Sequence, residues 1–123
     1  MVDDYAHHPT EIEATLNATL KINHRKVWCI FQPHTYTRTL SLMDDFARTL
    51  SKADTVIVTD IYAAREKDTG KVHSRDLAEK IDNSIYIKEF SDIAEYIKAN
   101  AKEGDIVLTM GAGNVCDISK LII

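Results

Sequence analysis

Short, mainly apolar runs recur along this chain and alternate with segments whose apolar residues repeat at helical spacing. The runs occupy residues 27–31, 55–59, 85–87 and 106–108. A run without polar alternation is typical of a parallel strand that is covered on both faces. With a residual strand at Val2, the pattern predicts an α/β, three-layer Rossmann-like domain. We expect a mainly parallel sheet of about five strands with helices on both faces.

The intervening segments carry helix signals. Pro9 suits the first turn of a helix, His8 is placed to cap it, and Glu11 is placed to complete a capping box. Apolar residues then repeat every fourth position to about residue 23. Later N-caps are expected at Thr37 or Thr39, at Ser74 and at Ser91. The inner face of the second helix is expected to carry Leu40, Met43, Ala47 and Leu50.

Composition narrows the class of protein. The chain has 123 residues, enough for one domain, and its formal net charge is −4. This balance argues against broad binding of nucleic acid or of acidic membranes. No apolar run approaches the ~20 residues of a membrane helix, and no secretory signal is visible. Cys29 and Cys116 are predicted to be buried, reduced thiols, as expected in a cytoplasmic protein.

Polar loops follow the predicted strands. They cover residues 3–8, 32–39, 60–73 and 110–114. The carboxyl ends of parallel strands meet at one edge of a sheet, and ligands bind there where the strand order reverses. We therefore expect the functional site at this edge.

The first polar loop gathers five titratable groups within six residues. These are Asp3, Asp4, Tyr5, His7 and His8. Capping explains one or two of them but not all five. Adjacent histidines diverge and no second pair has zinc-like spacing, so we predict no tight metal site. Because the loop begins almost at residue 1, with hardly room for a strand before it, we expect the chain to be part of a longer protein.

The second polar loop places Arg38 beside His34 and several threonines at the mouth of a predicted helix. A guanidinium binds carboxylate or phosphate in a bidentate way, and a helix N-terminus adds partial positive charge. The alternative is a solvated arginine among helix-capping threonines.

The loop at residues 60–73 is long and charged. Residues 67–71 are expected to form a surface flap, whereas Tyr62, Arg65 and Glu66 lie nearer the strand end and are candidate ligand contacts.

The turn at residues 111–114 is glycine-rich and lies between a predicted strand and a predicted helix. Its glycines indicate a close approach of the backbone to a ligand or a neighbouring loop, and Asn114 is a further candidate contact. Cys116 replaces the third glycine of a dinucleotide fingerprint, so no NAD site is predicted. The chain also contains no Walker A loop for a triphosphate.

Four motifs together resemble a known family. Asp-Asp-Tyr-Ala-His-His-Pro-Thr-Glu-Ile at residues 3–12, Gln-Pro-His-Thr-Tyr-Thr-Arg-Thr at 32–39, the loop at 60–66 and the turn at 111–114 resemble the C-terminal domain of the Mur ligases, over nearly the whole chain. The double histidine is most similar to the member that adds L-alanine to UDP-N-acetylmuramate.

The resemblance implies a bacterial, cytoplasmic ligase of peptidoglycan synthesis that uses ATP and Mg²⁺ and passes through an acyl phosphate. The UDP-sugar domain and the central ATP domain, which would hold most of the ATP and Mg²⁺ contacts, are absent from this sequence. This C-terminal domain would close over the central one. No catalytic residue is expected within it, and the chain alone is predicted not to ligate.

Residue roles follow from the same resemblance. The nucleotide-facing residues would be Asp4, Tyr5 and His7. The residues facing L-alanine would be His34, Arg38 and His8, and Arg38 would pair with its carboxylate. The expected role of His8 as a helix cap competes with a contact to the substrate. Thr35 stands where many relatives carry a second arginine.

Two other interpretations stay open at this point. A receiver domain of two-component signalling has similar length and strand–helix alternation, and Asp60 follows the middle strand. The lysine that it needs after the last strand is missing, and it would not explain His7, His8 or Arg38. A stand-alone nucleotide-binding or assembly module is the third option.

Overall fold

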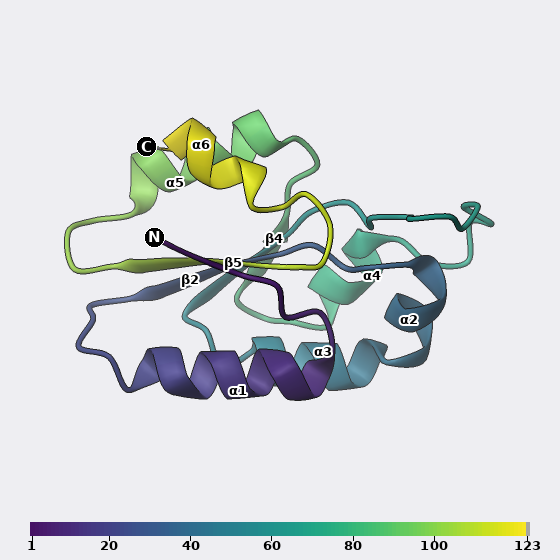
Figure 1. Ribbon diagram of the computed structural model, residues 1–123, viewed down its shortest axis with the longest axis horizontal. Coiled ribbons are helices and arrows are strands. Elements are labelled where there is room, and N and C mark those ends of the chain that lie inside the picture. Colours follow the sequence, from purple (N-terminus) through teal and green to yellow (C-terminus); the bar gives the residue numbers. More distant parts are fainter. Residues whose placement is uncertain (123) are drawn as a thin grey trace.

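The computed structural model describes residues 1–122 and contains one five-stranded sheet (Figure 1). Its strands are β1 (Val2–Asp4), β2 (Val27–Phe31), β3 (Thr55–Val58), β4 (Ser84–Tyr86) and β5 (Ile106–Met110). The order across the sheet is β1-β5-β2-β3-β4, and every neighbouring pair is parallel. The predicted parallel α/β sheet is confirmed: β2 has the predicted bounds, and the ends of β3, β4 and β5 lie within two residues of the predicted ones.

Helices cover both faces of the sheet. The helices are α1 (Pro9–Leu20), α2 (Tyr36–Ser41), α3 (Met43–Leu50), α4 (Ser74–Glu79), α5 (Phe90–Asn100) and α6 (Asp117–Ile122). Figure 1 shows α1, α3 and α4 on one face, α5 and α6 on the other, and α2 beyond the carboxyl ends of the strands. The connections from β1 through β4 run in one direction, and α5 carries the chain back to β5 on the opposite face.

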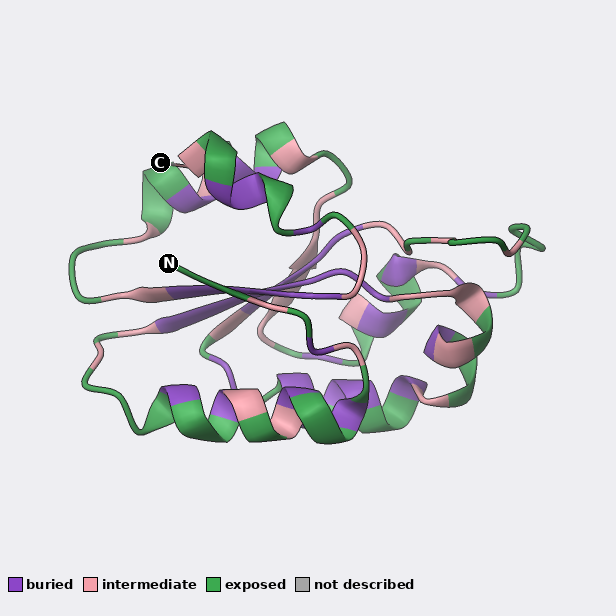
Figure 2. Cartoon of the chain, in the orientation of Figure 1, coloured by how far each residue is buried: buried purple, intermediate pink, exposed green. Residues whose placement is uncertain are grey.

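Each face of the sheet has its own apolar core, buried between strand and helix (Figure 2). Phe31 and Phe46 anchor the α1/α3/α4 side with ring centroids 5.3 Å apart, and both are fully buried. Ile57 and Ile97 belong to the α5/α6 side. Full burial of one such side chain stabilises the fold by about 1.5–3 kcal/mol. All five residues of β2 are buried, as its continuous apolar run predicts.

The start of α1 confirms the predicted capping box. Nδ1 of His8 accepts from the Thr10 backbone N–H at 3.3 Å, and the His8 N–H donates to Glu11 Oε1 at 3.1 Å. The helix ends at Leu20, three residues earlier than predicted.

The other predicted caps are wrong by one or more residues. The N-cap of α2 is Thr35, whose positive φ of 65° turns the chain into the helix before Thr37 or Thr39 is reached. His73 caps α4, because the Ser74 hydroxyl instead donates to the Thr59 carbonyl at 2.5 Å. The α5 helix starts after Glu89, ahead of the predicted Ser91, without a side-chain cap.

Two predictions of burial are also corrected. The single helix expected after residue 39 is split at Leu42, so Leu40 belongs to the separate short helix α2 and is 49% exposed. Cys29 is buried as predicted, and burial raises the pKa of its thiol. Cys116 is exposed, because it lies in the turn that leads into α6. Both cysteines are free.

Within residues 1–122, no helix is long and apolar enough to cross a bilayer.

Candidate functional site

The loops after β1, β2 and β5 meet at the carboxyl edge of the sheet. β5 lies between β1 and β2, and the helix that follows β5 covers the opposite face from α1. The connections therefore diverge at this point, which is where open α/β sheets bind ligands. The structure places the two predicted clusters next to each other here.

The two aspartates at the end of β1 make contacts that hold the loop. Asp3 accepts hydrogen bonds from the hydroxyls of Thr109 and Ser119, both at 2.5 Å, and so ties β1 to β5 and α6. Asp4 accepts from the Ala6 backbone N–H at 2.8 Å through one oxygen and from Thr15 Oγ1 at 3.1 Å through the other. Asp4 therefore shapes the loop that carries His7.

Four aromatic rings form a row along the edge. His7 is edge-on to Tyr5 on one side and to His34 on the other, with centroid distances of 5.7 and 5.8 Å. His34 stacks on Tyr62 at 5.6 Å with an interplanar angle of 16°. The row thus joins residues from the loops after β1, β2 and β3. Its outer end is open, since Tyr5 is 70% exposed.

Arg38 lies against this row. Its Nη1 is 3.3 Å from Nδ1 of His34. Because a guanidinium only donates, Nδ1 accepts and the neutral ring carries its proton on Nε2. Burial, and then the charge of Arg38, lower the pKa of His34, while Glu66 opposes this shift. Within residues 1–122, no carboxylate pairs with Arg38. Its remaining donors are free for an anion.

The two histidines of the first motif separate. His7 turns toward the row, and its Nδ1 is 3.1 Å from the Tyr5 carbonyl oxygen and 3.6 Å from Glu11 Oε1. His8 is exposed and directs its Nδ1 to the N-terminus of α1. The structure therefore brings His7 together with His34 and assigns His8 a capping contact.

Gln32 is a site residue that the sequence pattern did not single out. Its side chain is buried, its Nε2 donates to Asn114 Oδ1 at 2.9 Å, and its Oε1 has no hydrogen-bond partner in the described chain. A Cβ at Gly113 would lie 2.6 Å from both Gln32 Oε1 and the Tyr62 ring. The predicted close approach of the glycine turn is thus to neighbouring loops. The sequence signal for Gln32 is its place as the first polar residue after a fully buried strand.

The loop after β3 is joined to the loop after β2. The Tyr62 N–H donates to the Pro33 carbonyl and the Thr35 N–H donates to the Tyr62 carbonyl, both at 2.8 Å. Glu66 accepts from backbone N–H groups at the start of α2. Arg65 is exposed and makes no hydrogen bond or ion pair within the described residues. Tyr62 and Glu66 therefore belong to the structure of the site, whereas Arg65 faces solvent.

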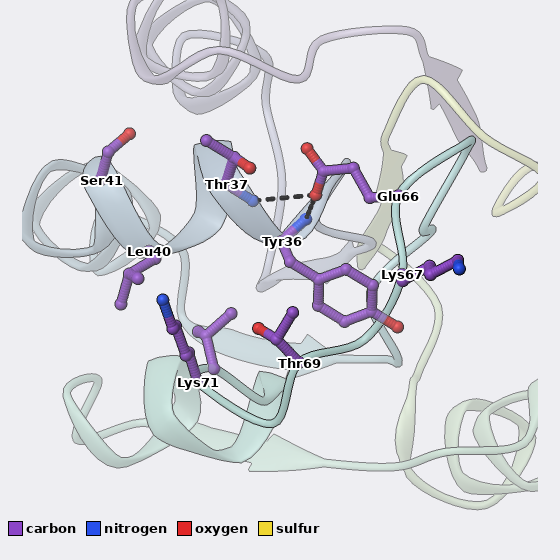
Figure 3. Close-up of a pocket in the computed structure, with 9 residues that line it drawn as sticks. Tyr36, Thr37, Leu40, Ser41, Glu66, Lys67, Thr69 and Lys71 are labelled. Atoms are coloured by element: carbon purple, nitrogen blue, oxygen red, sulfur yellow. Dashed lines mark hydrogen bonds between the residues drawn. The ribbon is translucent and has the colours of Figure 1, made fainter.

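A cavity opens next to Glu66 and the first turn of α2. It has a volume of about 650 Å³ and lies between α2 and the loop at residues 66–72 (Figure 3). The residues that line it are Tyr36, Thr37, Leu40, Ser41, Glu66, Lys67, Thr69, Lys71 and Val72. His7, His34 and Arg38 do not line this cavity, and all three are partly exposed. Among residues 1–122, no three His, Cys, Asp or Glu side chains converge as metal ligands.

Comparison with known proteins identifies the family to which the chain is similar. The family model of the Mur ligase glutamate ligase domain matches residues 1–113. The UDP-N-acetylmuramate–L-alanine ligase of Acetivibrio thermocellus is 53% identical over 127 aligned positions, which cover 100% of this chain and 27% of that protein. The ligase of the same name from Caldanaerobacter subterraneus subsp. tengcongensis is 54% identical over 124 positions, covering 98% and 27%.

A solved structure agrees with the sequence relatives. The UDP-N-acetylmuramate–alanine ligase of Thermotoga maritima is 28% identical, with a TM-score of 0.72 over 96% of this chain and 24% of that one. The chain thus spans about a quarter of the length of these relatives. The receiver-domain alternative is set aside by these matches. The chain belongs to the Mur ligase family, and it corresponds to the C-terminal domain of the family's ligases.

Proposed function

We propose that this chain is the amino-acid-binding domain of a bacterial, cytoplasmic ligase that joins L-alanine to UDP-N-acetylmuramate at the expense of ATP, in peptidoglycan synthesis. The observation that carries the proposal is the juxtaposition of His7, His34 and Arg38 at the carboxyl edge. It is supported by relatives of that name at 53% and 54% identity over nearly the whole chain.

Arg38 and His34 suit the recognition of an amino acid. The guanidinium has donors to spare for the carboxylate of L-alanine, and a bidentate pair would fix its orientation. The neutral His34 ring presents an Nε2–H donor without adding a second positive charge. Attack of an amine on an acyl phosphate needs orientation more than a dedicated nucleophile, and well-oriented groups lower such barriers substantially. These two side chains would supply that orientation.

Tyr5 and His7 form the nucleotide-facing part of the wall in this proposal. Their rings are partly exposed and meet in a T-shaped contact, so they offer a surface for a base or ribose. Asp4 acts on the nucleotide mainly by holding this loop, because each of its carboxylate oxygens already accepts a bond from the chain.

The phosphates and Mg²⁺ belong to the central domain in this proposal. The described residues gather no metal-ligand set, and the sequence has no Walker A loop. Closure of this domain over the central one would complete the site. It would also exclude water from the acyl phosphate, which water would otherwise hydrolyse.

A chimeric enzyme tests the proposal. This chain would replace the matching segment of the Acetivibrio thermocellus ligase, and product formation would be followed with ATP, UDP-N-acetylmuramate and L-alanine. We expect ligation that depends on all three, and none from the 123-residue chain alone. A folded chimera that binds ATP but does not ligate L-alanine would overturn the proposal. Ligation by the isolated chain would do so as well.

A further inference from the structure

We propose that Glu66 is a positioning residue of the amino-acid site, which sets the place of Arg38 and His34 by capping α2 from the neighbouring loop. The inference rests on the proposed function, because the groups that Glu66 places are those assigned to L-alanine. Glu66 itself touches no substrate in this proposal.

The carboxylate of Glu66 takes up two orphan donors of α2. Its Oε1 accepts from the Tyr36 N–H at 2.7 Å and from the Thr37 N–H at 3.0 Å (Figure 3). Within the first turn of a helix such N–H groups have no partner inside the helix. The N-cap Thr35 satisfies only the third, that of Arg38, at 3.3 Å. Glu66 therefore completes the cap from 30 residues away in the sequence.

The helix that it caps is short. α2 has six residues, and the chain breaks at Leu42 before α3 begins. A helix of this length gains little stability from its own hydrogen bonds, so contacts from outside determine its position. Arg38 is its third residue, one position beyond the N–H groups that Glu66 holds. A shift of the first turn would move the guanidinium directly.

The same loop also holds His34. Two backbone hydrogen bonds join Tyr62 to Pro33 and to Thr35, and the Tyr62 ring stacks on His34. The turn between Tyr62 and Glu66 is closed by a hydrogen bond from the Glu66 N–H to the Ala63 carbonyl at 3.0 Å. One five-residue segment, 62–66, therefore fixes the positions of both His34 and Arg38. Its first residue contacts the loop after β2, and its last residue caps α2.

The negative charge of Glu66 has a measurable effect on the pKa of His34. Hydrogen bonds from Thr37 and then Tyr36 lower the pKa of Glu66, so its carboxylate is ionised at neutral pH. That negative charge raises the pKa of His34, against the larger lowering by burial and Arg38. Removal of the charge should lower the pKa of His34 further.

The kinetic test uses the chimeric ligase with Glu66→Gln, Glu66→Ala and, as a control in the same loop, Asp68→Asn. Asp68 bonds only to the Gly70 N–H and is exposed. Loss of a hydrogen bond to a charged group corresponds to a factor on the order of ten. We expect Glu66→Ala to raise the KM for L-alanine about ten-fold or more, with the KM for ATP unchanged. Glu66→Gln, which keeps an acceptor oxygen, should lie between Glu66→Ala and the parent. Asp68→Asn should match the parent.

A second readout needs no ligase activity. In the 123-residue chain, proton NMR should show a lower pKa of His34 in Glu66→Gln than in the parent, and faster amide exchange at Tyr36 and Thr37. An unchanged His34 titration, with unchanged exchange, would overturn the positioning role whatever the chimera does. An active chimera whose KM for L-alanine is insensitive to Glu66→Ala would also overturn it. An inactive parent chimera with the expected NMR changes would contradict the proposed function instead.

Discussion

Replacement of Gly113 by alanine tests how closely the three loops of the carboxyl edge fit together. The added Cβ would lie 2.6 Å from Gln32 Oε1 and from the Cγ and Cδ2 atoms of Tyr62. An ordinary contact between carbon atoms is about 3.5–4.0 Å, so the new methyl group is roughly 1 Å too close. Gln32 cannot retreat easily because it is 5% exposed. The Tyr62 backbone is also held, by its bonds to Pro33 and Thr35.

The Tyr62 ring must therefore rotate away from His34. Overpacking of this kind costs about 1–3 kcal/mol. Loss of a stacked aromatic pair costs about 0.5–1.5 kcal/mol. Because rotation relieves part of the overlap at the expense of the stack, we expect Gly113→Ala to lower the free energy of unfolding by about 2 kcal/mol. A ring that leaves His34 also exposes it to water, so the pKa of His34 should rise toward its ordinary value.

Urea unfolding followed by Trp28 fluorescence measures the first effect, and proton NMR titration of His34 measures the second. Gly70→Ala is the matched control. A Cβ there meets no atom within 4 Å, but its φ of +76° still carries a backbone cost of about 1–2 kcal/mol. That variant should lose stability without any change in the His34 titration. A Gly113→Ala variant within about 0.5 kcal/mol of the parent, with an unmoved His34 pKa, would refute the packing argument.

Two further predictions concern other parts of the chain. Thr35→Gly should lower the free energy of unfolding in urea less than Thr35→Ala does, because glycine adopts the φ of 65° and ψ of 146° without strain. Alanine keeps the strain and loses the hydroxyl cap on the Arg38 N–H, which costs about 1 kcal/mol. A Thr35→Gly variant that loses more stability than Thr35→Ala would contradict this account of the cap. Hydrogen bonds from Arg25 and Trp28 hold the pKa of Asp105 well below its usual range, so its stabilising effect should be intact above the unfolded pKa of about 3.9 and fade as pH falls below it. Asp105→Asn should flatten the acid limb of stability against pH, and an equally steep limb in that variant would argue against this role.

Much of the fold could be predicted because its signals are local. The buried runs of β2 and β3 need only the residues within them, and the capping box at His8 spans four consecutive positions. The wrong predictions concern features that depend on contacts between residues far apart in the sequence. Ser74 is a good cap by type, but its hydroxyl is drawn to the Thr59 carbonyl, so the cap moves to His73.

In the candidate site, too, some contacts could be predicted from the sequence and others could not. The meeting of His7 with His34 follows from the rule that carboxyl ends of parallel strands share an edge, and the structure brings them to 5.8 Å. The hydrogen bonds of Glu66 could not be predicted, because they depend on the path of a long loop that has no periodic pattern. The orphaned Gln32 Oε1 likewise depends on how a turn more than 80 residues later packs against it.

In the proposed function, Arg38 pairs with the carboxylate of L-alanine. The most direct measurement compares kcat/KM for L-alanine and for L-alaninamide, which lacks that carboxylate, in the parent chimera and in Arg38→Ala. Truncation of a hydrogen-bonded charge pair costs about 2–5 kcal/mol, so the parent should prefer L-alanine by roughly 30-fold or more. The variant should lose most of that preference, because its L-alanine rate falls while its L-alaninamide rate changes little. Arg48→Ala, on the exposed face of α3, is the control and should keep the preference. A preference of the same size in Arg38→Ala and in the parent would contradict the assignment.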